Sequence, residues 1–161
     1  MSDLARLVRV LADGNVQFIL VGGLAANAHG SSRVTTDVDV VYARTDANIA
    51  RLVKALAPIK PYLRGAPEGL PFEWSVKTIR AGLNFTLTTK HGPLDLLGEI
   101  IGGGGYEDLE PHSTSVRAFD RDVLLIDLPW LIKVKRAAGR PKDFEVIAEL
   151  EAILEEGDAA R

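Results

Sequence analysis

The chain has 161 residues, enough for one ordinary domain with a buried core and too few for two large ones. Hydrophobic residues make up 47% and charged residues 25%, the formal net charge is −3, and there is no cysteine. This composition excludes disulfides, thiolate metal sites and cysteine nucleophiles, and it argues against a general nucleic-acid coat protein. No apolar run is long enough to cross a membrane, and the N-terminus lacks the pattern of a signal peptide. We therefore expect a cytoplasmic protein without a membrane partner.

Helical and strand patterns alternate through the first third of the chain. Apolar residues at helical spacing predict helices, and short β-rich apolar runs such as VQFILV predict buried strands. The expected elements are a helix over 3–13, a strand over 16–21, a short helix after Gly22-Gly23 that ends at Gly30, a strand over 37–42, and a helix over about 46–57.

The remaining chain predicts a hairpin, further strands and two last helices. Residues 58–75 hold four prolines and are expected to be mostly loop, with a short strand at most. The expected elements that follow are hairpin strands over 84–89 and 94–97, a glycine loop over 102–105, one or two strands in TSVRAF and VLLIDL, a helix after Pro129, and a helix from Pro141 to about 156. The pattern predicts an α/β or α+β domain around a mixed sheet flanked by helices, with a core over 1–127 and a helical segment over 128–157.

Two aspartates lie one residue apart in the apolar run DVDVVY. Because side chains alternate across a strand, Asp37 and Asp39 are expected on the same side, about 7 Å apart along the backbone. Two carboxylates held side by side repel each other, and a divalent cation between them removes this cost. Carboxylate oxygens with open water positions suit Mg²⁺. The alternative interpretation is structural: Asp37 caps a turn and Asp39 faces solvent.

A third acid, Asp95, stands alone in the apolar run GPLDLLG. A single acid in such a run also has a structural explanation, which is a pair with an arginine. Three carboxylates around one or two Mg²⁺ ions, however, are the arrangement used for in-line phosphoryl chemistry. The sequence therefore makes Asp37, Asp39 and Asp95 candidate metal ligands.

Two glycines, Gly22 and Gly23, follow the first predicted strand and precede the Asp-x-Asp by thirteen residues. Glycines at a strand-to-helix turn let backbone N–H groups approach an anion closely, and the start of a helix favours negative charge. The pattern predicts a phosphate-binding turn close to the metal ligands. An ordinary tight turn is the alternative.

These residues together resemble the nucleotidyltransferase fold superfamily, whose core is similar to that of DNA polymerase β. The family carries an apolar residue followed by Gly-Gly or Gly-Ser, then Asp-x-Asp in a strand, then a third acid on a later strand. The resemblance covers residues 16–42 well and 84–98 moderately. It implies the nucleotidyltransferase fold, nucleotide phosphates at the glycines, and one or two Mg²⁺ ions on the three acids, which are also the catalytic residues.

The segment LIKVKRAAGRPKDFEVI raises a separate question because Lys135 falls in the middle of an apolar helix face. Such a lysine can snorkel to the surface, pair with an acid, or reach a bound phosphate. The segment is similar to the closing motif of bacterial nucleotidyltransferases of the abortive-infection and toxin–antitoxin type, with Val146 where those proteins often have a second Asp. The residues that match this motif are Lys135, Arg140, Lys142 and Asp143. The resemblance implies phosphate contacts by Lys135 and by Arg33, which stands just before the first Asp.

The leading hypothesis is a Mg²⁺-dependent nucleotidyltransferase that moves a nucleoside monophosphate from an NTP to a hydroxyl group. Asp95 is expected to help deprotonate that hydroxyl, which belongs to an RNA, a protein or a small molecule. The resemblance points to a toxin–antitoxin or phage-defence role with a cognate toxin or antitoxin partner. The main alternative is a binding module or antitoxin-like subunit with the same fold and no turnover. A third interpretation is a small-molecule modifying enzyme of the antibiotic-nucleotidyltransferase type.

Overall fold

The computed structural model describes residues 2–159 and contains a seven-stranded mixed sheet. The strands are β1 (Phe18–Val21), β2 (Val38–Tyr42), β3 (Tyr62–Leu63), β4 (Asn84–Thr89), β5 (Gly92–Leu97), β6 (Ser113–Ala118) and β7 (Arg121–Ile126). Across the sheet they follow the order β3-β4-β5-β2-β1-β7-β6. The β2–β5 and β1–β7 pairs are parallel, and the other pairs are antiparallel. The predicted mixed α/β class is confirmed.

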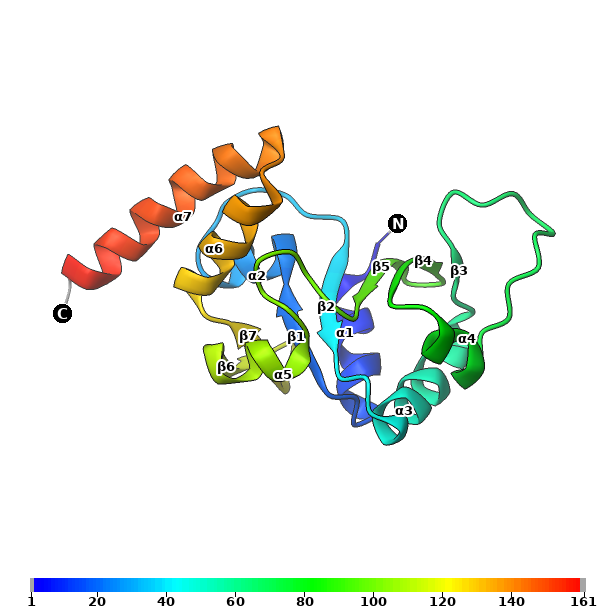
Figure 1. The fold of residues 1–161 in the computed structure, drawn as a ribbon. Coiled ribbons are helices and arrows are strands. Elements are labelled where there is room, and N and C mark those ends of the chain that lie inside the picture. The colour runs from blue at the N-terminus through cyan, green and yellow to red at the C-terminus, as the bar shows by residue number, and fades with distance from the viewer. Residues whose placement is uncertain (1, 160–161) are drawn as a thin grey trace.

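Helices flank this sheet and two of them close the chain. They are α1 (Leu4–Asp13), α2 (Gly22–Ala28), α3 (Asp46–Leu56), α4 (Val76–Ala81), α5 (Tyr106–Leu109), α6 (Leu128–Ala138) and α7 (Pro141–Ala159), with short 3₁₀ turns η1 (Ala57–Ile59) and η2 (Glu110–His112). Figure 1 shows α7 extending away from the sheet, and the loop between β3 and α4 at the opposite end of the molecule. Within residues 2–159, no helix combines the length and apolar character that crossing a bilayer requires.

The middle of the sheet is built from the most apolar segments of the chain. All four residues of β1 are buried, and in β2 only Asp39 is not. The antiparallel β1–β2 pair sets Val21 opposite Asp39, and the parallel β2–β5 pair sets Asp39 beside Asp95. The register therefore brings segments far apart in sequence to one place at the centre of the sheet.

Polar side chains cap α1 and α3, and a buried amide attaches α3 to the sheet. The Asp3 side chain accepts a hydrogen bond from the Arg6 backbone N–H at the start of α1, and Thr45 caps α3 in the same way. The fully buried Asn48 donates from Nδ2 to the carbonyl oxygens of Gln17 and Ala43 at 3.1 and 2.7 Å. Because these partners flank β1 and β2, the amide holds α3 against the central strands.

A left-handed glycine joins the two C-terminal helices. Gly139 ends α6 with a φ of 64°, and Pro141 begins α7 two residues later. The turn folds α7 back onto α6, which also packs against α2. This packing brings the basic segment that contains Lys135 next to the turn that follows β1.

Two short helices, α4 and α5, were not expected from the sequence, while β3 is the short strand expected at most within residues 58–75. The two helices have six and four residues, which is too short for a hydrophobic period to be recognised. The second predicted strand also began one residue early, because β2 starts at Val38 and Asp37 lies in the preceding loop. The predicted 84–97 hairpin, the two further strands and the two closing helices are confirmed.

Candidate active site

Three carboxylates meet at the end of the two central parallel strands. Asp39 of β2 and Asp95 of β5 are direct neighbours in the sheet, and Asp37 immediately precedes β2. One carboxylate oxygen from each residue lies within 4.8 Å of the other two. Among the residues that the structure describes, this is the one group of such side chains close enough to hold a metal ion.

Asp39 is the member of this cluster that has an oxygen buried from solvent. Its burial, together with the negative charges of Asp95 and Asp37, raises the pKa of Asp39 to about 7. Its Oδ1 atom is buried and has no hydrogen-bond partner in the described structure. A buried acceptor without a partner is costly, and a coordinated cation removes that cost. The three carboxylates therefore fit a hard divalent cation such as Mg²⁺, which takes oxygen ligands.

Gly22 leaves room for the Asp39 carboxylate. Its φ is +68°, and a Cβ built on it would lie 2.1 Å from Asp39 Oδ2. A Cβ on Gly23 would lie 2.7 Å from the Thr35 Oγ1 atom. A side chain at either glycine would collide with the segment that carries the acids. This close approach therefore requires glycine at both positions, in addition to any role in anion binding.

A polar cavity of about 310 Å³ opens over the acidic cluster. Its floor includes the three aspartates and the two glycines of the β1–α2 turn. Four cationic side chains also line it, namely Arg33, Lys135, Arg140 and Lys142. Because carboxylates and cations share one cavity, it suits a polyanion bound together with a metal ion.

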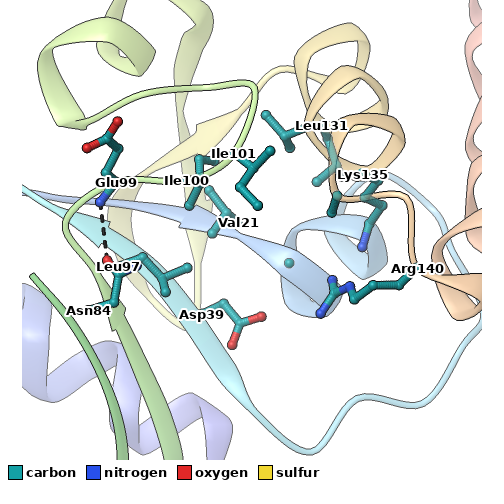
Figure 2. Close-up of a pocket in the computed structure, with 13 residues that line it drawn as sticks. Val21, Asp39, Asn84, Leu97, Glu99, Ile100, Ile101, Leu131, Lys135 and Arg140 are labelled. Carbon is teal, nitrogen blue, oxygen red and sulfur yellow. Dashed lines mark hydrogen bonds between the residues drawn. The ribbon is translucent and has the colours of Figure 1, made fainter.

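An apolar cavity of about 330 Å³ lies on the other side of Asp39. Leu97, Ile100, Leu131 and Val134 line it together with Ile101, a side chain that is exposed. Figure 2 shows the amino group of Lys135 and the guanidinium of Arg140 pointing toward the space above Asp39. The residues common to both cavities are Gly22, Asp39, Lys135 and Arg140. The two cavities therefore meet at Asp39, the cluster acid whose pKa is raised.

The two cations at this junction are held by one buried acid. Asp143 has a side chain only 3% exposed, and it accepts a hydrogen bond from Arg140 Nε at 2.7 Å. Lys135 Nζ lies 4.0 Å from Asp143 Oδ1. Burial lowers the pKa of Lys135, while the charges of Asp143 and Asp39 oppose that shift. Burial alone would raise the pKa of Asp143, but the hydrogen bonds and charge of Arg140 and the charge of Lys135 lower it.

Arg33 lies on the opposite wall of the polar cavity. Its Nη1 atom is 3.2 Å from Glu145 Oε2, and about half of the side chain is exposed. Nearby, the Ser31 hydroxyl and the Ser32 backbone N–H donate to the Glu149 carboxylate at 2.5 and 3.2 Å. The loop that leads to Asp37 is therefore attached to α7.

Two residues of this region lay outside the functional interpretation of the sequence. Asp143 matches the closing motif, which implied no role for it, and the structure sets it against Arg140 and Lys135. Arg64, directly after β3, contacts Asp95 and lies near Asp37. No local signal marks Arg64, since it stands in a segment expected to be loop. All the residues predicted for the site, namely Gly22, Gly23, Arg33, Asp37, Asp39, Asp95 and Lys135, line the polar cavity.

The sheet, its register and the acidic cluster at its centre define a chain with the nucleotidyltransferase fold. Comparison with solved structures gives the same result. The crystal structure of a candidate nucleotidyltransferase from Thermotoga maritima has a TM-score of 0.57 and 12% identity, with 92% of this chain and 94% of that chain covered. The structure of the lincosamide antibiotic adenylyltransferase LnuA with lincomycin bound has a TM-score of 0.62 and 15% identity, with 93% and 95% covered. The predicted fold is thus confirmed.

Other comparisons add nothing to this result. No protein-family model matches the sequence, and no curated protein matches it. At 12% and 15% identity the solved structures show the fold alone. The closer resemblance to toxin–antitoxin nucleotidyltransferases stays a prediction from the Lys135–Asp143 segment.

Proposed function

We propose that this chain is a Mg²⁺-dependent nucleotidyltransferase that transfers a nucleoside monophosphate from an NTP to a hydroxyl acceptor. The observation that carries the proposal is the cluster of Asp37, Asp39 and Asp95, whose oxygens lie within 4.8 Å of one another below a cavity lined by four cations. Phosphoryl transfer requires this combination, because the metal and the cations stabilise the charge that spreads over the phosphate oxygens. The fold shared with LnuA supports the same reaction class.

The two cavities divide the substrate between them. The polar cavity takes the triphosphate beside Lys135, Arg140 and Lys142, and the apolar cavity takes the nucleoside beside Leu131 and Val134. This arrangement sets the α-phosphate at the junction, above Asp39. Arg33 joins the phosphate contacts when its ion pair with Glu145 opens.

The proposed reaction is a single in-line displacement. The three aspartates would hold Mg²⁺, and the ion would supply positive charge that neutralises the phosphate oxygens. Asp95 accepts the proton of the acceptor hydroxyl, and the hydroxyl oxygen forms a bond to the α-phosphorus. The bond from that phosphorus to the bridging oxygen breaks, so pyrophosphate leaves with the electron pair. Lys135 and Arg140 stabilise the charge on the leaving pyrophosphate.

The acceptor and the cellular role are the finer parts of the proposal. The similarity of the Lys135–Asp143 segment to toxin–antitoxin nucleotidyltransferases supports a cytoplasmic toxin–antitoxin or phage-defence role with a cognate partner. The structure of LnuA, an adenylyltransferase with a small molecule bound, instead favours ATP and a small hydroxylated acceptor as a second candidate. Both candidates use the same metal and nucleotide site.

Isothermal titration with each of the four NTPs tests the proposal, with Mg²⁺ and then with EDTA. We expect binding of at least one NTP that requires Mg²⁺ and that is lost in the double variant Asp37→Ala/Asp39→Ala. The control variant Asp46→Ala/Asp122→Ala removes two exposed acids that lie outside the cluster. It should bind like the wild type.

The same titration separates the proposal from its alternative. Absence of binding for all NTPs would contradict it. Mg²⁺-dependent binding without pyrophosphate release, over a panel of RNA, protein and small-molecule acceptors, would favour the binding module. A nucleotide-labelled acceptor identified by mass spectrometry would settle which class of acceptor is used.

A further inference from the structure

Arg64 supplies a positive charge to the acidic cluster, in contact with two of its three aspartates. Its Nη2 atom lies 2.8 Å from Asp95 Oδ1, and its Nη1 atom lies 3.7 Å from Asp37 Oδ2. The side chain is only 30% exposed. It contacts one oxygen of each of these carboxylates, and it makes no contact with Asp39.

Neighbouring backbone groups fix the guanidinium in this position. Arg64 Nε and Nη2 both donate to the carbonyl oxygen of Leu87, at 3.2 and 2.8 Å. The Arg64 backbone N–H donates to the carbonyl oxygen of Thr86 at 3.0 Å. Surface ion pairs contribute little partly because long side chains must be immobilised to form them. Here strand β4 holds the side chain from one side while Asp95 binds it from the other.

The charge balance indicates what this arginine does. Three ionised carboxylates and one guanidinium leave a charge of −2 at the cluster, which one divalent cation cancels. Without a metal ion, Arg64 is the cation in contact with the cluster, because Lys135 and Arg140 are paired with Asp143. Arg64 and the metal ion therefore both offset the repulsion among the same carboxylates.

We propose that Arg64 is a positioning residue that holds Asp95 and Asp37 in place and partly neutralises the cluster, so that it competes electrostatically with the divalent cation. This inference rests on the proposed metal site and assigns a role to a residue outside it. Arg64 keeps the cluster ordered before the metal ion binds. It also limits how tightly the metal ion is held, since its charge repels the cation.

Binding of Mn²⁺ alone, followed by electron paramagnetic resonance, tests the proposal without any nucleotide or acceptor. In Arg64→Gln we expect Mn²⁺ to bind about tenfold more tightly than in the wild type, because a nearby positive charge is removed. We also expect a lower melting temperature in EDTA and a larger increase on adding Mn²⁺. A side chain with only a structural role would not tighten metal binding.

Two further variants sharpen the test. Arg64→Lys keeps the charge without the planar fork, so it should restore the wild-type affinity for Mn²⁺ to within about twofold. Arg80→Gln removes a matched arginine that pairs with Asp46 at 2.9 Å on the surface, and it should leave the affinity for Mn²⁺ unchanged. If Arg64→Gln folds only when Mn²⁺ is present, the metal ion replaces the lost positive charge, and this outcome would support the proposal most strongly.

The outcomes separate this proposal from the proposed function. Wild-type protein that binds no Mn²⁺ would refute the metal site itself. Wild-type protein that binds Mn²⁺, with equal or weaker binding in Arg64→Gln, would overturn the role of Arg64 and leave the metal site intact. Binding of Mn²⁺ to Arg64→Lys as tight as to Arg64→Gln would show that the planar fork, and not the charge, limits metal binding, and would overturn the electrostatic competition.

Discussion

At the scale of single residues, the site depends on a carboxylate that has one oxygen buried within an apolar strand. Asp39 has a raised pKa of about 7 and a buried oxygen without a partner. The apolar strand β2 supplies this position, since the neighbouring side chains Val38 and Val40 are fully buried. Keeping the Asp39 carboxylate ionised at this position lowers the stability of the metal-free protein, and this loss of stability can be measured.

The stability of the metal-free protein should depend on the protonation of Asp39. Its folded-state pKa of about 7 lies above the unfolded value of 3.8, so the folded protein binds a proton more tightly. The stabilisation from this proton is complete below about pH 4 and is lost as pH rises through about 7. Urea unfolding in EDTA should show this loss in the wild type, on the order of 1–3 kcal/mol.

The variant Asp39→Asn isolates this contribution, because other acids also make the stability depend on pH. The pKa of Asp13 and the pKa of Glu149 are lowered, each chiefly by a side-chain hydrogen bond, and such groups give the opposite slope. The wild-type curve minus the Asp39→Asn curve should therefore fall between pH 4 and pH 7 and be flat above. A flat difference over the whole range would contradict the raised pKa of Asp39.

Gly22 should tolerate no side chain. In Gly22→Ala the methyl group would lie 2.1 Å from Asp39 Oδ2 on a backbone with φ of +68°, so Asp39 or the turn must move. We expect a loss of about 2–4 kcal/mol in urea unfolding and weaker Mn²⁺ binding. Gly69→Ala is the matched control, because Gly69 has φ of +85° with nothing within 4 Å of the added methyl. It should cost about 1 kcal/mol and leave Mn²⁺ binding unchanged.

At the scale of elements, the sequence predicted those features that a hydrophobic period or a short motif reveals. The helices and strands that hold Asp39, Asp95 and Lys135 were found because their apolar patterns are regular and their turns contain Gly or Pro. The motif also indicated that Gly22-Gly23 and the aspartates lie together, which they do in the polar cavity. Local information therefore covered most of the site.

What the sequence could not give is contact between distant segments. Arg64 reaches Asp95 only because the antiparallel β3–β4 and β4–β5 pairs set its segment beside β5. Asp143 holds Arg140 and Lys135 only because the Gly139 turn folds α7 onto α6. The division into a core over 1–127 and a helical segment over 128–157 stays a prediction.

The α6–α7 turn should depend on Asp143. In Asp143→Asn the buried negative charge is lost while Arg140 and Lys135 remain close to each other. We expect a loss of about 1–3 kcal/mol in urea unfolding and weaker NTP binding, because both cations lose their anchor. Glu151→Gln is the control: Glu151 pairs with Arg136 between the same two helices but on the surface. Its effect should stay below about 0.5 kcal/mol. Equal effects of the two variants would contradict the anchoring role.

At the scale of the whole molecule, the sheet order decides where a substrate can lie. The antiparallel β1–β2 pair and the parallel β2–β5 pair place the β1–α2 turn and the acidic cluster at one edge, formed by the ends of the central strands. Helix α6 packs beside this edge and contributes Lys135, which lies between the polar and the apolar cavity. One bound molecule that fills both cavities must therefore have an anionic part and an apolar part that meet at Asp39.

This division predicts that binding of the triphosphate part and binding of the nucleoside part of an NTP can be weakened separately. Lys142→Gln, in the polar cavity, should weaken binding of both inorganic tripolyphosphate and the preferred NTP about tenfold, because both lose a charged contact. Ile101→Ser, in the apolar cavity, should weaken NTP binding about threefold and leave tripolyphosphate binding unchanged. Ile101 is 71% exposed, so this variant should fold normally.

Titration calorimetry with Mg²⁺ present distinguishes these cases for each variant and ligand. Leu70→Ser, which changes an exposed apolar residue that lines neither of these two cavities, is the control and should leave both affinities unchanged. If Ile101→Ser weakened tripolyphosphate as much as the NTP, the apolar cavity would not be the nucleoside site. If it changed neither ligand, the nucleoside would have to lie elsewhere, and the apolar cavity would then be free for the acceptor, whose hydroxyl must also reach the acidic cluster.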